Sequence, residues 1–338
     1  MKANKWNILF ISIASIALIL FIYITNDVES LKKIIFSANI KWLLIAILCM
    51  VIYWILETGV LYCTANSVKR KLSYFHAFKT TMVGQLFNCL TPFSSGGQPM
   101  QAYFLMKAKF EIGEATGILL MKFIVYQGAM VLYTGLLLVI KLTFFVDHVA
   151  SVGYLAILGF TVNLVVIFGL MAIGFFPNLT LRISNGSIHL LAKFKIIKRK
   201  EYLLEKVDTQ IHSFHKEFRT LLTQKTILAK SVGITFLQLT AYFLIPFCIC
   251  MAFQVQNASI ISIVAASAFV MMISAFVPLP GASGGAEGSF YLFFGIFLLN
   301  PSIIAVAVVV WRLITFYLPI FVGMFFCQFG HSTSASQN

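Results

Sequence analysis

Long apolar runs, separated by short polar segments, dominate the pattern of hydrophobic positions along the chain. An α-helix needs about 20 apolar residues to cross the hydrocarbon core of a bilayer. Transmembrane β-strands would instead alternate apolar and polar residues, and these runs do not. The pattern therefore predicts an all-α integral membrane protein with about six full transmembrane helices, at residues 8–25, 42–65, 113–141, 150–176, 227–253 and 302–327.

Two further apolar segments, about 76–105 and 259–299, are each interrupted by proline and glycine. The interruptions share the spacing P-x-x-S-G-G, at Pro92–Gly97 and at Pro280–Gly285. Paired breaks of this kind, one in each half of a chain, are typical of transporters built from inverted repeats. We expect two re-entrant helical hairpins of opposite sense. The alternative is a pair of ordinary loops outside the membrane, rich in turn residues.

Such breaks free backbone N–H and C=O groups at the depth of the membrane, where they are tolerated only against protein or a polar cavity. Freed N–H groups at the start of a half-helix attract anions. The candidate lipid-binding residues of the two breaks are Gly96, Gly97, Gln98, Ser283, Gly284 and Gly285. The predicted structural breaks are Pro92, Pro280 and, in the last span, Pro319.

The composition supports a membrane protein, since 60% of the 338 residues are hydrophobic and only 11% are charged. Soluble globular proteins have about 25% charged residues. We interpret residues 1–330 as one polytopic membrane domain and 331–338 as a polar tail.

The formal net charge of +14 comes mostly from basic residues that flank the apolar runs. This placement indicates cytoplasmic loops beside anionic headgroups rather than nucleic-acid binding. The more basic loops place both the N-terminus and the C-terminus in the cytoplasm, with the protein in the cell membrane.

The longest polar stretch, about 177–225, contains ten Lys and Arg residues and four Asp and Glu residues. Apolar residues recur in it at steps of three and four, from Leu204 to Leu221, which indicates an amphipathic helix. We expect this basic segment to lie on the anionic headgroups of the inner leaflet. Binding of a soluble partner is the alternative.

Four charged residues, Glu57, Lys122, Glu287 and Arg312, fall within apolar segments. A charge at the centre of a bilayer costs about 2.5–3.5 kcal/mol on insertion scales, so such residues usually face the protein interior in pairs. We expect Glu287 and Arg312 to pair. Lys122 would then be available, with Arg312, to an anionic headgroup. Alternatively, all four form packing ion pairs or extend to a membrane interface.

Catalytic interpretations have little support. Gly281–Gly284 resembles the G-x-S-G of intramembrane serine proteases, but only His331 follows Ser283, and no histidine base is placed to serve the serine. Asp27 and Glu29 could form the acidic pair of a lipid-linked-sugar glycosyltransferase, but their loop is short. The six cysteines form no C-x-x-C motif, so we expect neither a metal nor a cofactor.

Three motifs together resemble the membrane domain of the lysylphosphatidylglycerol synthase/flippase family: Pro92–Pro99, Pro278–Glu287 and Trp311–Gly323. The resemblance covers essentially the whole chain. It implies a bacterial inner-membrane protein that handles anionic lipids, with both broken segments near the translocation path. Glu287 and Arg312 match the acidic and basic positions of the family. Gln98 stands where some members are expected to have a basic residue.

Full-length synthases carry a soluble aminoacyltransferase domain, and this chain ends about ten residues after its last span, so we expect that activity to be absent. We expect a flippase for an anionic, aminoacylated or polyprenyl-linked lipid. The alternatives are a phosphatidylglycerol lysyltransferase or glycosyl transferase, and an accessory subunit of an envelope enzyme. A homo-oligomer or a partner envelope enzyme is compatible with each.

Overall fold

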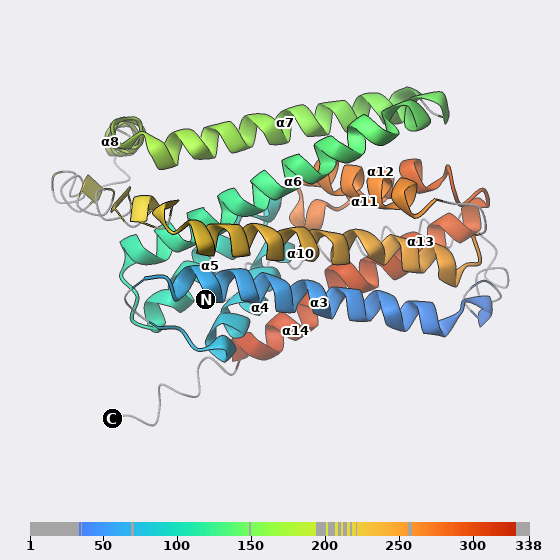
Figure 1. Ribbon diagram of the computed structural model, residues 1–338, viewed down its shortest axis with the longest axis horizontal. Helices are drawn as coiled ribbons and strands as arrows, with labels where there is room; N and C mark the ends of the chain where they lie inside the picture. The colour runs from blue at the N-terminus through green and yellow to red at the C-terminus, as the bar shows by residue number, and fades with distance from the viewer. Residues whose placement is uncertain are drawn as a thin grey trace.

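All regular structure in the described part of the chain is helical (Figure 1). The computed structural model describes residues 34, 36–68, 71–148, 150–193, 201, 207, 208, 211, 215, 216, 218–220, 222–255 and 259–328. The expected first span, 8–25, the tail, 331–338, and most of 194–221 lie outside these residues.

Five helices are long and apolar enough to cross a membrane, and they coincide with five of the six expected spans. They are α3 (Ile40–Ala65), α6 (Ile112–His148), α7 (Ala150–Phe175), α10 (Lys225–Ala252) and the continuous α13–α14 helix (Pro301–Arg312 and Leu318–Gln328). The all-helical fold is therefore confirmed for the described residues.

Helices α3 and α10 are antiparallel neighbours along the long axis of the bundle (Figure 1). At one end, Asn39 N–H donates to Ala252 O over 2.9 Å. At the other end, Gln224 Nε2 donates to Ser67 O over 3.2 Å. Because the start of each helix lies beside the end of the other, this pair fixes the two ends of the molecule.

The first broken segment forms α4 (Tyr74–Leu90), the 3₁₀ turn η1 (Pro92–Ser94) and α5 (Gly97–Lys107). The second forms α11 (Ile260–Ser274), the 3₁₀ turn η2 (Pro280–Ala282) and α12 (Gly285–Phe294). In both, a 3₁₀ turn begins at the first proline of the shared motif and a helix begins at its last glycine. We call residues 91–97 the first elbow and residues 279–285 the second elbow.

The two elbows have matching backbones where the shared motif begins. Phe93 and Gly281 have φ values of 54° and 61°, and the next residues, Ser94 and Ala282, have 51° and 55°. These left-handed values are uncommon for residues other than glycine. The elbows diverge afterwards, because Gly284 has a φ of 84° and Gly96 has −78°. The short sequence match therefore reflects a structural match.

The elbows meet between the ends of the bundle. The α4–α5 hairpin occupies the end marked by Ala65 and Lys225, and the α11–α12 hairpin occupies the opposite end (Figure 1). The tips η1 and η2 are in contact. Each half of the chain has the same order of elements: a long helix, a half-helix, an elbow, a second half-helix and a long helix.

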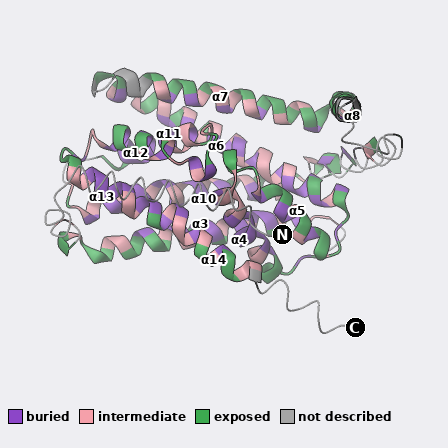
Figure 2. Ribbon diagram, turned by 180° about the vertical axis from the view of Figure 1, so that it is seen from behind, coloured by how far each residue is buried: buried purple, intermediate pink, exposed green. Residues whose placement is uncertain are grey.

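Helices α7 and α8 (Pro177–Lys193) lie at the edge of the bundle. Helix α7 packs on α6 and α11, and exposed residues recur from Tyr154 to Phe175 (Figure 2). In Figure 1, α7 runs across the view and α8 is seen end-on, so the axes of the two helices cross. It contains the first part of the expected amphipathic stretch.

Pro319 distorts the last helix but does not end it. The five residues before Leu318 form a π-turn, Leu313–Tyr317, in which Leu318 N–H donates to Leu313 O. Proline has no N–H to donate, and such single π-turns absorb the irregularity within an otherwise continuous helix. The expectation of a break at Pro319 is corrected accordingly.

Close packing of α14 on α4 depends on Gly323. A Cβ at this position would lie 2.6 Å from Leu86 Cβ and 2.7 Å from Met82 O. We expect Gly323→Ala to destabilise the protein by about 1–3 kcal/mol through overpacking, measured as a lower melting temperature in detergent. Gly233→Ala on α10 is the matched control, since its Cβ would meet open space. Equal melting temperatures for the two variants would contradict the packing.

Candidate functional site

A cavity of about 650 Å³ lies where the two elbows meet. Its wall is formed by residues of α3, α4, α5, α6, α7, α10, α11 and α12, by both elbows, and by the junction of α13 with the π-turn. Ligand sites commonly have volumes of about 300–1,000 Å³. The cavity is therefore large enough for a small molecule or a lipid headgroup.

Arg312 is the most constrained charged residue of the cavity. It is only 5% exposed, at the end of α13. Its Nη1 donates to Gly281 O over 2.9 Å, which ties the last long helix to the second elbow. Trp311 and Phe316 lie beside the guanidinium, with ring centroids 5.0 and 5.4 Å from its central carbon.

The expected pairing of Glu287 with Arg312 is confirmed. Arg312 Nε lies 2.8 Å from Glu287 Oε1. The contact is an ion pair whose direction is too oblique for a hydrogen bond. Arg312 Nη2 has no hydrogen-bond partner within the described part of the chain, although it is buried. One donor of a buried cation therefore remains unused by the protein.

Glu287 also closes the start of α12. Its Oε2 accepts a hydrogen bond from Gly284 N over 2.7 Å, so its two oxygens serve two different groups. An acidic residue in the first turn interacts favourably with the partial positive charge of a helix N-terminus. Glu287 therefore holds Arg312 and the second elbow in one arrangement.

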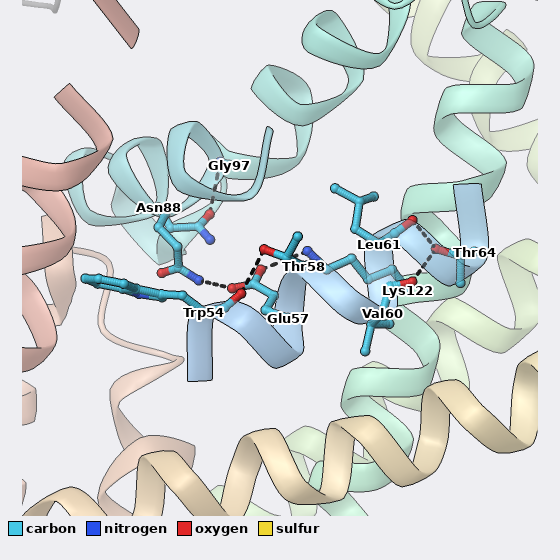
Figure 3. Close-up of polar contacts among 10 residues, drawn as sticks. Trp54, Glu57, Thr58, Val60, Leu61, Thr64, Asn88, Gly97 and Lys122 are labelled. Carbon is cyan, nitrogen blue, oxygen red and sulfur yellow. Dashed lines mark hydrogen bonds and ion pairs between the residues drawn. The ribbon is translucent and has the colours of Figure 1, made fainter. Parts of the chain in front are cut away.

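Lys122 is paired rather than available. Its Nζ lies 2.8 Å from Glu57 Oε1, and Gln85 Nε2 donates to Glu57 Oε2 (Figure 3). The side chains of Lys122 and Glu57 are 13% and 8% exposed, and both residues line the cavity. The expectation that Lys122 is free for an anionic headgroup is corrected. The packing ion pair, left open above, is what the structure contains.

The glycine N–H groups of the elbows are also engaged within the protein. Gly96 N donates to Thr91 Oγ1 over 2.7 Å. Gly97 N donates to Asn88 Oδ1 over 3.0 Å, as Figure 3 shows. Because the Gly284 N–H is bound to Glu287, these three glycines do not supply free donors to a headgroup. Their absence of a side chain serves packing instead, since a Cβ at Gly97 would collide with Asn88.

The remaining predicted elbow residues differ in where they lie. Gln98 is exposed and lines the cavity. Ser283 is outside the lining, and its hydroxyl donates to Pro280 O over 2.8 Å. The equivalent Ser95 donates to Pro92 O over 2.9 Å. Gly285 packs against Val277, where a Cβ would collide. Ser283 and Gly285 therefore shape the second elbow.

Sequence reasoning missed the uncharged polar wall of the cavity. Side-chain amides and tyrosine hydroxyls gather there from six helices, α3, α4, α5, α6, α7 and α10. The amides are Gln85, Asn88, Gln98, Gln101, Gln127, Asn163 and Gln238, and the tyrosines are Tyr53, Tyr126 and Tyr242. Gln127, Asn163 and Gln238 interrupt otherwise apolar runs, and that signal could have identified them.

A metal centre has no basis in the described residues, where no group of three His, Cys, Asp or Glu side chains is placed to hold a metal ion.

The sequence matches the family described as "Lysylphosphatidylglycerol synthase TM region" over residues 7–323. A "UPF0104 membrane protein" of Archaeoglobus fulgidus is 28% identical over 321 residues, which cover 92% of this chain and 93% of that protein. A second "UPF0104 membrane protein", of Methanothermobacter thermautotrophicus, is 25% identical over 329 residues, which cover 94% and 93%. Neither description states an activity.

We expect the Glu57–Lys122 ion pair to contribute to the stability of the protein. Glu57→Gln would leave an unpaired ammonium in a largely buried position, and we expect a loss of about 3 kcal/mol. The double variant Glu57→Gln/Lys122→Gln removes both charges and should be more stable than Glu57→Gln alone. Glu111→Gln, at an exposed carboxylate, is the matched control. Melting temperatures in one detergent are measured for these variants and for the single variant Lys122→Gln, and strict additivity of the two substitutions would refute the pairing.

Proposed function

Since the chain belongs to the lysylphosphatidylglycerol synthase transmembrane-region family, we propose that it moves a lipid with an anionic headgroup between the two leaflets of a cell membrane. The headgroup would pass through the central cavity while the acyl chains stay among the apolar outer faces of the helices. The observation that carries this proposal is Arg312 Nη2, which has no hydrogen-bond partner among the described residues.

An anionic headgroup cannot cross the hydrocarbon core without a compensating charge, because transferring an isolated ion into such a medium is very costly. Arginine suits this task, since its guanidinium is always charged, weakly hydrated and matched in geometry to phosphate oxygens. Arg312 is held in place by Glu287 and Gly281 before any ligand binds, so little ordering is required on binding.

The arrangement of the two halves supports a transporter. In this proposal the hairpins are re-entrant from opposite faces of the membrane, as the antiparallel α3 and α10 and the matching elbows suggest. Each half also places one cation on the helix that follows its hairpin, Lys122 on α6 and Arg312 on α13. Inverted repeats of this kind allow one half to rock against the other around a fixed site.

Helix α8 supports an orientation in the membrane. In this proposal it lies flat on the inner leaflet, since it crosses the axis of α7 and exposes Arg182 together with apolar Leu179 and Ile183 (Figure 1). Basic residues beside exposed apolar ones are typical of helices at anionic membrane surfaces. The termini are then cytoplasmic.

The direct test is movement of a fluorescent phosphatidylglycerol analogue in proteoliposomes that contain the purified chain. We expect Arg312→Gln to slow this movement about 10- to 100-fold, because one charge-assisted interaction contributes about 1.5–3 kcal/mol. Arg312→Lys should retain part of the activity. Arg182→Gln, the same change at an exposed arginine outside the cavity, is the matched control.

A neutral double variant, Arg312→Gln/Glu287→Gln, separates loss of function from misfolding, since it leaves no unpaired carboxylate. Movement that persists in both Arg312→Gln and the double variant would refute the proposal. Formation of a modified lipid without movement would instead identify a transferase. If the protein melts normally but neither moves nor modifies a lipid, the role of an accessory subunit is the interpretation that remains.

A further inference from the structure

We infer that the lipid carried by this cavity has a hydroxyl-rich headgroup, such as a glycerol, polyol or sugar attached to the phosphate, rather than a headgroup bearing ammonium groups. This inference rests on the proposed function and names its substrate class. It is drawn from two buried glutamines whose side chains form no hydrogen bond with the described residues.

Gln101 and Gln127 are 4% and 9% exposed, and both line the cavity. No hydrogen bond among the described residues involves either side-chain amide. Neither amide is among the fully enclosed polar atoms that lack a partner, so both reach the open space of the cavity. Two amides that the described residues leave unbonded in one cavity wall are therefore available to a polar species bound there.

The backbone of the first hairpin makes room for one of these amides. The side chain of Gln101, on α5, lies against Gly84 of α4, where a Cβ would collide with the amide nitrogen. Gln98 lies on the same helix three residues earlier and lines the same cavity, and residues three apart share one helix face. The amides of the first hairpin thus face a cavity whose cation, Arg312, is bonded to the second elbow.

Amides are suited to hydroxyl groups because each amide offers both donors and an acceptor, and each hydroxyl is both donor and acceptor. A phosphate alone would use the donors and leave the amide oxygens without partners. A headgroup with a phosphate beside Arg312 and hydroxyls beside Gln101 and Gln127 would satisfy all of them.

An ammonium-bearing headgroup finds no free counter-charge in the described residues of the cavity. Glu57 is engaged by Lys122 and Gln85. Glu287 is engaged by Arg312 and Gly284 N–H. With two acids and two bases paired, the wall has no carboxylate left to compensate an ammonium group, whose burial without a partner is costly.

The test compares lipids that share acyl chains and one negative phosphate but differ in hydroxyls. The purified chain is reconstituted in equal amounts of phosphatidylglycerol and phosphatidylmethanol, and the retained lipids are quantified by mass spectrometry. Movement of matched fluorescent analogues is measured in parallel, and lysylphosphatidylglycerol is added as a third lipid. The variant is the double substitution Gln101→Met/Gln127→Met, which keeps side-chain length but removes the amides.

We expect the wild-type protein to prefer phosphatidylglycerol over phosphatidylmethanol by at least about fivefold, in binding and in movement. In the double variant this ratio should fall about five- to tenfold, as expected for two lost neutral hydrogen bonds. Gln254→Met, at an exposed glutamine outside the cavity, should leave the ratio unchanged.

Equal retention of phosphatidylglycerol and phosphatidylmethanol by the wild-type protein would overturn the inference, and so would an unchanged ratio in the double variant or a preference for the lysylated lipid. The first two results would mean that water alone satisfies the amides. Failure of the proposed function is a separate result: no lipid moves, and Arg312→Gln changes neither movement nor retention. The retention ratio still decides the headgroup preference in that case.

Discussion

The central constraint on this structure is that interrupted backbone can lie among apolar helices only if its polar groups find partners inside the protein. Arg312 meets this constraint at the second elbow by donating to Gly281 O. Glu287 satisfies a second backbone group of the same elbow, because its Oε2 accepts a hydrogen bond from Gly284 N. The same ion pair that satisfies the elbow therefore also fixes a buried cation beside the cavity. In the proposed function, the stability of the elbow and the binding of an anion therefore depend on the same contact.

The four charged side chains at the cavity form two ion pairs, and one of these pairs still has a donor that can bind an anion. Glu57 with Lys122 and Glu287 with Arg312 form two pairs at 2.8 Å, so no net charge has to be buried. The pairs are not equivalent. Arg312 Nη2 is unbonded within the part of the chain that the structure describes, whereas the carboxylate of Glu57 has two partners. One pair is therefore suited to stabilising the fold and the other to binding an anion.

Much of the fold could be predicted from the sequence, because apolar length and glycine-proline breaks are local signals. Five spans, both breaks and the pairing of Glu287 with Arg312 were found in this way. The partner of Lys122 could not be assigned, since Glu57 is 65 residues away along the chain. The glycine N–H groups were misjudged because Thr91 and Asn88 reach them only in the folded elbow. The amide wall could not be predicted, because single uncharged amides such as Gln127, Asn163 and Gln238 lie on different helices and come together only in the folded bundle.

The central claim is that the two elbows enter the membrane from opposite faces and meet at a headgroup site beside Arg312. An electron cryomicroscopy structure of the full chain in nanodiscs that contain phosphatidylglycerol tests it most directly. The account predicts both elbows at the depth of the hydrocarbon core, with phosphate density within hydrogen-bond distance of Arg312 Nη2. Elbows outside the bilayer, or Nη2 bonded to another group of the protein, would contradict it.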